Sequence, residues 1–306
     1  MASPVIQTEN LSKVYGSGDK AVQALDHLNL SVNQGEIFGY LGPNGAGKTT
    51  TIRLLLDLIR PTEGRASILG MDAQADSVEL HKRIGFMPGE LALWKNLSGQ
   101  EVVNFVGKVR GGVDSAQVAQ LTKRLELDLS IKVRSYSSGN RRKLGLVLAL
   151  MNRPELLILD EPTTGLDPLM QQIFSEMMRE VRSEGRTVFL SSHVLSEVQA
   201  ICDRVGILRK GDLKAVERVS DLTHADFRWV TLELRDGIQL APTLEALEGV
   251  SEVKAEDGLL KLRLTGDFDP LLRALNEVYV VDLRVAEPSL EEIFLAFYGN
   301  NQEGVS

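Results

Sequence analysis

Short apolar runs alternate with segments of helical periodicity over the first two thirds of the chain. Apolar runs of strand length are separated by stretches in which apolar residues recur every three or four positions. The predicted strands are residues 36–41, 155–159, 187–191 and 205–208, and the predicted helices are residues 48–58, 169–184 and 194–202. Strands that alternate with helices predict a mostly parallel sheet, so the fold class of this region is α/β.

Residues 88–153 have a different pattern and are predicted to form a block of helices. Ser98 and Glu101 have the spacing of a capping box, and Asp114 with Gln117 resembles a second helix start. Apolar residues follow both starts at helical spacing.

Residues 4–80 are rich in predicted strands and contain several glycines, apart from one strongly helical segment at 48–58.

The pattern changes again from about residue 216. Strands are predicted at 229–234, 250–255, 259–264 and 279–285, with helices at 243–248, 269–278 and 289–298. Asp257-Gly258 between the second and third strands is a hairpin signal. Up to the fourth strand the order is β-α-β-β-α-β, which is the ferredoxin-like α+β pattern. We therefore expect two domains, residues 1–220 and 221–306.

Length and composition agree with a globular protein of two domains. The chain has 306 residues, of which 43% are hydrophobic and 25% charged, which excludes a disordered or fibrous protein. The formal net charge of −8 disfavours nucleic acid as a partner. The one cysteine, Cys202, cannot form a disulfide within the chain, fits a reducing cytosol, and is expected to be a buried small residue.

Neither a membrane span nor a signal peptide is expected. The most apolar run, residues 144–151, has about eight residues, whereas a spanning helix needs about twenty. The N-terminus lacks a basic segment followed by an apolar core. If the protein works at a membrane, another chain must hold it there.

A phosphate-binding loop is predicted between the strand at 36–41 and the helix at 48–58. The residues Gly42, Pro43, Asn44, Gly45, Ala46, Gly47, Lys48 and Thr49 match the pattern G-x-x-x-x-G-K-[ST]. Glycines let backbone N–H groups turn toward a phosphate, and the helix N-terminus adds partial positive charge. Lys48 is expected to reach the β- and γ-phosphates of a nucleotide, and the Thr49 hydroxyl to bind Mg²⁺. Thr50 lies in the first turn of the helix that leaves the loop.

Two carboxylates end the apolar strand at 155–159. Asp160 is placed at the carboxyl end of a buried parallel strand, where ligands bind in α/β sheets, so it is a candidate Mg²⁺ ligand together with Thr49. Glu161 lies one residue further out, toward an attacking water. A solvated acidic turn is the alternative interpretation of this pair.

Three further motifs accompany these two. Tyr136-Ser137-Ser138-Gly139-Asn140 precedes a helix, Gly165-Leu166-Asp167 follows Glu161, and Ser191-Ser192-His193 follows another apolar strand. In order, they resemble the signature motif, the D-loop and the switch histidine of ABC-type ATPases. The stretch LLILDEPTTGLDP at 156–168 is specific to that family. The chain is thus identified as a member of the ABC transporter ATP-binding subunits, and the segment 287–294 resembles the tail of the multidrug and antibiotic-export type.

The resemblance implies a fold, a reaction and partners. The fold is a P-loop NTPase domain of the ABC type, with a mixed sheet core and a helical subdomain at about 88–153, followed by the small ferredoxin-like domain. The activity is ATP hydrolysis with Mg²⁺, and the partners are a second ATP-binding subunit, expected as a homodimer, and a separate multi-span membrane permease. The chain would then be cytoplasmic and held on the inner face of the cell membrane by that permease.

The resemblance also assigns roles to residues. Ser137 and Gly139 donate to the γ-phosphate of an ATP bound by the partner subunit, with Ser138, Asn140 and Asp167 in the same interface. Glu161 positions or deprotonates water, while His193 contacts the γ-phosphate and Lys48 binds it. Tyr15 resembles the aromatic residue that stacks on adenine. The alternatives are a half-buried strand tyrosine for Tyr15 and a helix-capping residue for His193.

The chain departs from the family pattern at two places. Gly89 stands where a glutamine is usual, so either Glu90 substitutes or the role is missing, which puts the coupling step in doubt. The signature has Tyr136, Ser138 and Asn140 where Leu, Gly and Gln are common. The neighbouring run 141–143, Arg-Arg-Lys, is interpreted as a solvated helix face without a catalytic role.

Two other functions remain as alternatives to the ATPase of a drug exporter. The first is the ATPase subunit of an importer, although many importers carry barrel-like C-terminal modules. The second is an ABC ATPase acting on nucleic acid or the ribosome. Lys48 and Asp160 are 112 residues apart with no sustained heptads between them, and the chain has a single phosphate loop. Neither feature is typical of such proteins.

Overall fold

The computed structural model describes residues 4–223, 227–235, 240–256, 258–276 and 278–286. The chain divides into two compact units, residues 1–218 and 219–306. The first unit contains every motif that the sequence predicts to bind nucleotide.

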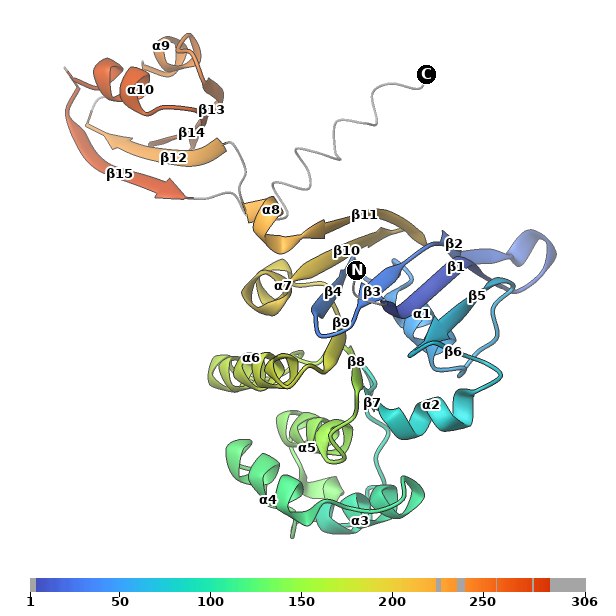
Figure 1. The fold of residues 1–306 in the computed structure, drawn as a ribbon. Helices are drawn as coiled ribbons and strands as arrows, with labels where there is room; N and C mark the ends of the chain where they lie inside the picture. Colours follow the sequence, from blue (N-terminus) through green and yellow to red (C-terminus); the bar gives the residue numbers. More distant parts are fainter. Residues whose placement is uncertain (1–3, 224–226, 236–239, 257, 277, 287–306) are drawn as a thin grey trace. The chain divides into compact units, whose positions relative to one another are not determined.

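Six strands of the first unit form a sheet in the order β11-β10-β4-β9-β8-β7 (Figure 1). Neighbours from β10 to β7 are parallel, and β11 pairs antiparallel with β10. The strands are β4 (Ile37–Leu41), β7 (Ile84–Met87), β8 (Leu156–Asp160), β9 (Thr187–Ser192), β10 (Arg204–Arg209) and β11 (Asp212–Arg218). The predicted parallel sheet is confirmed. Strands β4, β8, β9 and β10 lie within one or two residues of the predicted ranges, whereas β7 and β11 were not predicted as strands.

A second, antiparallel sheet of the same unit comes from the N-terminal part of the chain. Its strands are β1 (Pro4–Tyr15), β2 (Val22–Leu28), β3 (Ser31–Asn33), β5 (Glu63–Ile68) and β6 (Met71–Asp72). Helix α1 (Lys48–Leu55) contributes Ile52 and Leu55 to a single apolar core with residues of both sheets, including Ile6 and Phe38. The helix that follows the phosphate loop is therefore anchored in the unit's main core.

Two helices of the first unit differ from the sequence prediction. Helix α1 ends at Leu55 rather than at residue 58, and Asp57 has a left-handed φ of 54° that no helix can include. Helix α2 (Ser77–Arg83) was not predicted. It has seven residues and buries only Leu80, so it leaves almost no apolar periodicity in the sequence.

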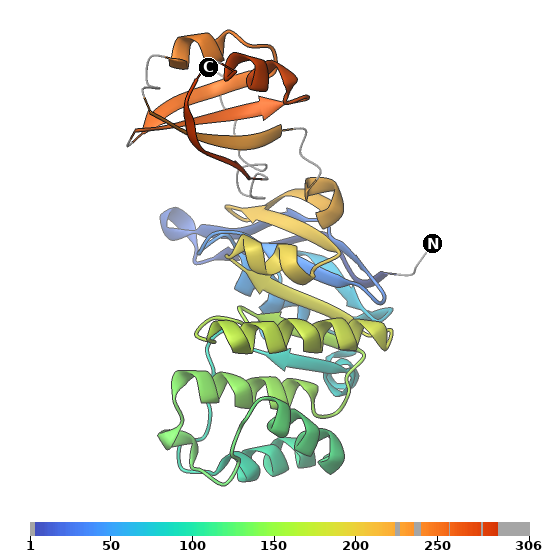
Figure 2. The same ribbon diagram turned by 90° about the vertical axis from the view of Figure 1, so that its left-hand side faces the viewer.

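The helical block is confirmed (Figure 2). It contains α3 (Gly99–Val109), α4 (Ser115–Arg124) and α5 (Ser138–Leu150). Ser98 and Glu101 form the predicted capping box, and the Asp114 carboxylate accepts a hydrogen bond from the Gln117 N–H. Helix α5 packs against β7 and so joins the block to the parallel sheet.

Helices α6 (Pro168–Ser183) and α7 (Leu195–Ile201) pack against β4 and β9. Gly39 lets α7 come close to β4, because a Cβ there would lie 2.6 Å from Val198 and 3.0 Å from the Cys202 sulfur. Cys202 is buried as predicted, and burial raises the pKa of its thiol. A buried thiol with a raised pKa is a packing residue and a poor nucleophile.

The second unit has the predicted ferredoxin-like topology. After α8 (Val219–Thr223), its elements are β12 (Phe227–Leu234), α9 (Ala241–Glu245), β13 (Val250–Glu256), β14 (Leu259–Thr265), α10 (Asp269–Ala274) and β15 (Val280–Ala286). The strands form an antiparallel sheet in the order β13-β14-β12-β15, with α9 and α10 on one face (Figure 2). Its core includes Val230, Leu232, Leu262 and Leu271. In the second unit, the helix predicted at 269–278 ends at Ala274, the helix predicted at 243–248 lies at Ala241–Glu245, and the helix Val219–Thr223 was not predicted. The predicted helix at 289–298 lies outside the described residues.

No helix within the described residues combines the length and the apolar character needed to cross a bilayer.

Candidate nucleotide-binding site

The loop between β4 and α1 requires glycine at two positions. Gly45 and Gly47 have φ values of 80° and 110°, in the left-handed region that residues with a Cβ rarely adopt. A Cβ at Gly47 would also lie only 2.5 Å from the Ala24 carbonyl oxygen. Strand β4 enters the loop almost fully buried, and α1 leaves it at Lys48, so the loop is held between two rigid elements.

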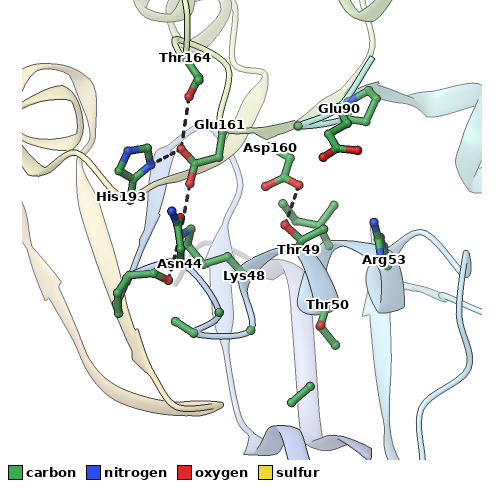
Figure 3. Close-up of a pocket in the computed structure, with 18 of the residues that line it drawn as sticks. Asn44, Lys48, Thr49, Thr50, Arg53, Glu90, Asp160, Glu161, Thr164 and His193 are labelled. Carbon is green, nitrogen blue, oxygen red and sulfur yellow. Dashed lines mark hydrogen bonds and ion pairs between the residues drawn. The ribbon is translucent and has the colours of Figure 1, made fainter. Parts of the chain in front are cut away.

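The loop forms one wall of a pocket of about 710 Å³ (Figure 3). Residues from β8 and β9, or directly after them, form the opposite wall. The pocket brings together most of the predicted site, namely Pro43, Asn44, Gly45, Ala46, Gly47, Lys48, Thr49, Thr50, Asp160, Glu161 and His193. Gly42 contributes through its carbonyl oxygen, which accepts a hydrogen bond from Lys48.

Lys48 carries a buried positive charge at the base of the loop. Only 6% of its surface is exposed. Its Nζ donates to the carbonyl oxygens of Gly42 at 2.6 Å and Pro43 at 3.3 Å, and lies 3.2 Å from Glu161 Oε1. A buried ammonium at the N-terminus of a helix is suited to the terminal phosphates of a nucleotide.

Thr49 and Asp160 form an oxygen-rich corner of the pocket. Thr49 Oγ1 donates to Asp160 Oδ2 at 2.9 Å, and Ser191 Oγ donates to Asp160 Oδ1 at 2.5 Å. One hydroxyl and one carboxylate fit Mg²⁺ that is bound mainly by nucleotide phosphates and water. Among the described residues, no group of three or more His, Cys, Asp or Glu side chains could hold a metal ion.

Ser191 is a site residue for which the sequence suggested no role. It is fully buried at the carboxyl end of β9, next to β8, where it holds Asp160 and also accepts a hydrogen bond from the Glu161 N–H at 3.0 Å. Its position in Ser191-Ser192-His193, at the end of a predicted central strand, is the signal that could have identified it.

Glu161 points into the pocket from the turn after β8 (Figure 3). Its Oε2 is hydrogen-bonded to His193 Nδ1 at 2.5 Å and lies 3.5 Å from Thr164 Oγ1, while its Oε1 faces Lys48. The backbone of Glu161 has a φ of 49°, an uncommon conformation for a residue other than glycine. The carboxylate is thus fixed between two groups that can carry positive charge.

The predicted signature residues lie elsewhere. Ser137 is the N-cap of α5, where its Oγ accepts a hydrogen bond from the Asn140 N–H, and Ser137 and Ser138 are exposed. Asp167 caps α6 by accepting from the Met170 N–H. Among the described residues, none of 137–140 and neither Asp167 nor Tyr15 lines the pocket.

Tyr15 ends β1 and is 38% exposed, with Lys13 Nζ 5.3 Å from the centre of its ring. The partial burial fits both interpretations made from the sequence, an adenine-stacking residue and a half-buried strand residue.

The interpretation of the run 141–143 as a solvated helix face is wrong for Arg142. Arg142 is only 7% exposed, and its three guanidinium nitrogens donate to the carbonyl oxygens of Gly89, Glu161 and Thr164. Burial lowers the pKa of the guanidinium, and the charges of Asp160 and Glu161 raise it. The periodicity of α5 concealed this role, because an arginine that reaches inward looks the same in sequence as one that faces solvent.

Gly89 lies against the carboxylate of Asp160. A Cβ at this position would be 3.2 Å from Asp160 Oδ2. Glu90 also lines the pocket, although it is exposed (Figure 3). The usual glutamine is therefore replaced by a residue that has no side chain next to the predicted metal ligand.

Comparisons with known proteins show which family the chain resembles. The family described as ABC transporter matches residues 25–164. The bacitracin transport ATP-binding protein BcrA of Bacillus licheniformis is 33% identical over 99% of this chain and 100% of its own length. The daunorubicin resistance ATP-binding protein DrrA3 of Streptomyces coeruleorubidus is 35% identical over 99% of this chain and 98% of its own.

Solved structures extend the likeness to three dimensions. The structure of an ATP-binding subunit of an ABC transporter aligns with a TM-score of 0.65 and 28% identity, covering 71% of this chain and 91% of its own. A dimeric ATP-binding cassette in a post-hydrolysis state, bound to ADP and Pi, aligns with a TM-score of 0.64 and 26% identity over 70% of this chain and 98% of its own. The chain belongs to the ATP-binding subunits of the ABC transporter family.

Proposed function

We propose that the ATPase activity of this chain drives the export of an antibiotic-like compound through separate membrane subunits. The observation that carries the ATPase part is the position of Glu161, whose carboxylate is held between Lys48 and His193 beside Thr49 and Asp160. Two relatives that align with this chain over nearly their whole length are named for bacitracin transport and daunorubicin resistance, which supports export as the direction of transport.

In this proposal, backbone N–H groups of the glycine-rich loop, such as those of Gly45 and Gly47, and the ammonium of Lys48 bind the phosphates. Thr49 and Asp160 hold Mg²⁺, which supplies charge neutralisation at the phosphate oxygens. Glu161 orients the attacking water and accepts its proton, and His193 orients the Glu161 carboxylate and contacts the γ-phosphate. Phosphoryl transfer needs positioning and charge stabilisation above all, and these residues provide both.

The remaining predicted site residues act across an interface. Ser137, Ser138, Gly139 and Asn140 lie at the exposed start of α5 and contact the ATP held by the loop of a second copy of this chain. Asp167 lies in the same interface, and Tyr15 stacks on the adenine. Support comes from the exposure of Ser137 and Ser138 outside the pocket, and from the dimeric state of a similar cassette.

The membrane part requires a multi-span permease, which holds the chain at the cytoplasmic face of the membrane. In this proposal, the permease selects the transported compound.

The proposal is tested by expressing the chain together with the multi-span protein encoded beside it. Cells with both proteins should survive higher concentrations of bacitracin or daunorubicin than cells with either alone, and the Lys48→Ala variant should abolish the gain. Purified protein should hydrolyse ATP only with Mg²⁺. A purified wild type that does not hydrolyse ATP would contradict the ATPase role, and hydrolysis without any gain in drug tolerance would contradict drug export.

A further inference from the structure

Arg142 joins two separate segments of the nucleotide site, the loop at Gly89 and the turn 161–164 after β8, to helix α5 through their backbones. It lies near the start of α5, five residues after the N-cap Ser137. Its Nη1 donates to Gly89 O at 2.6 Å, its Nη2 to Glu161 O at 2.6 Å and its Nε to Thr164 O at 3.2 Å. Hydrogen bonds from a charged and largely buried group are stronger than those between neutral groups.

One of these bonds helps to fix the backbone of Glu161 in an unfavourable conformation. Left-handed φ values in residues other than glycine persist only where the surroundings impose them. Ser191 Oγ accepts from the Glu161 N–H at 3.0 Å, and Arg142 binds the carbonyl oxygen of the same residue. Because both peptide groups of Glu161 are held, its carboxylate is aimed at Lys48 and His193.

A second hydrogen bond of Arg142 is made to Gly89, where this chain departs from the family pattern. Gly89 has no side chain that could reach a ligand, yet its carbonyl oxygen is held by Arg142. The loop that carries Gly89 and Glu90 is therefore tied through its backbone to the helix that begins at the signature.

We propose that Arg142 is a positioning residue for hydrolysis, which holds the backbones of Glu161 and Gly89 in place from the signature helix. This inference rests on the proposed ATPase function. It implies that Arg142 governs the rate of the chemical step and contributes little to ATP affinity, since the phosphates are bound by the loop 43–49. A lysine cannot replace it, because a single ammonium does not match three carbonyl groups as a planar guanidinium does.

The test is the Arg142→Lys substitution in the full-length protein, with Arg141→Lys as the matched control. Arg141 is the adjacent arginine on α5, and its guanidinium donates to Tyr136 O at 3.3 Å. We expect kcat to fall at least about tenfold in Arg142→Lys, as misplaced catalytic groups cost up to about a hundredfold. KM and the equilibrium affinity for ATP should stay within about threefold, because only the transition state loses an interaction. Arg141→Lys should match the wild type.

A second measurement separates positioning from a general structural role. In a Glu161→Gln background, the side chain of residue 161 no longer acts as a base, so positioning it brings little benefit. If Arg142 and Glu161 act as a unit, adding Arg142→Lys to this background should lower the residual single-turnover rate less than about twofold. Equal losses in both backgrounds would overturn the proposal.

The other outcomes are also decisive. A wild-type kcat in Arg142→Lys, a parallel loss of ATP affinity, or a variant that fails to fold in a thermal unfolding assay would each overturn the positioning role. Failure of the proposed function would be seen separately, as a wild-type protein that does not hydrolyse ATP.

Discussion

In the first unit, strands β8 and β9 are buried along their whole length, whereas β12 of the second unit alternates between buried and more exposed residues. Both sheets have helices packed on them, but the directions of their strands differ. Strands β4, β8 and β9 are parallel, and β12 is antiparallel to both of its neighbours.

Strand direction decides where polar side chains can gather. The carboxyl ends of parallel strands lie at one edge of the sheet, and so β8 and β9 bring Asp160 and Ser191 together there. Neighbouring antiparallel strands end at opposite edges, so their terminal residues do not gather in this way. In the second unit, the buried positions of β12 instead build one apolar face with Val230 and Leu232. The residues that line the candidate nucleotide pocket therefore all lie in the first unit, whereas the apolar face of β12 contributes to the core of the second.

The largest effect that this comparison predicts comes from Glu161. The Glu161→Gln variant keeps the size of the side chain but loses its basicity, so turnover should fall by about 10²- to 10⁴-fold. Binding of ATP should persist, because the phosphate loop is unchanged. Steady-state hydrolysis and equilibrium nucleotide binding measure the two quantities.

The matched control is Glu155→Gln, at the opposite end of β8. Glu155 pairs with Arg83 at 2.6 Å, away from the pocket. It should hydrolyse ATP like the wild type. A Glu161→Gln protein with wild-type turnover would remove Glu161 from the chemistry.

Local motifs explain why so much of this site could be predicted from the sequence. The loop 42–49 and the pair Asp160-Glu161 each lie within a few residues of a strand end, and the topology of a parallel sheet then brings them together. The βαββαβ order of the second unit was predicted for a similar reason, since β12 shows its period of two directly in the sequence.

Contacts between distant side chains and backbones could not be predicted in the same way. Arg142 bonds to carbonyl groups 19 to 53 residues away, and a backbone carbonyl has no signature in the sequence. Helix α5 is also buried on most sides, so its pattern does not reveal which residue faces the pocket. Ser191 was missed because its partners, Asp160 and Glu161, come from another strand and the turn that follows it.

A smaller effect is expected when two inactive variants are mixed. Ser137 lies outside the pocket that contains Lys48, so in the proposed head-to-tail dimer the two residues serve one ATP from different chains. Lys48→Ala and Ser137→Arg should each be inactive alone. Mixed in equal amounts they should recover about a quarter of the wild-type rate, since half of the dimers are heterodimers with one intact site of two.

The control for this experiment is each variant mixed with itself and assayed at the same total concentration. Heterodimers must be demonstrated by purification on two different tags. Verified heterodimers without any hydrolysis would contradict independent head-to-tail sites. Ser137 of one chain and Lys48 of the other would then not form an independently active site.

The smallest effect is predicted for removal of the second unit. Strand β11 runs to Arg218 and pairs with β10, so truncation after Arg218 leaves the six-stranded sheet complete. ATP affinity should then change by no more than about threefold, which corresponds to the small free-energy change expected for alterations away from a site.

Dimerisation or binding to the permease should weaken instead, because we propose that the second unit assists subunit pairing or contact with a partner. Equilibrium ATP binding by the truncated protein, shown to be folded by its thermal unfolding, measures the first quantity, and analytical ultracentrifugation with permease pull-down measures the second. A hundredfold loss of ATP affinity would mean that residues after 218 complete the nucleotide site, and the division of roles between the two units would be wrong.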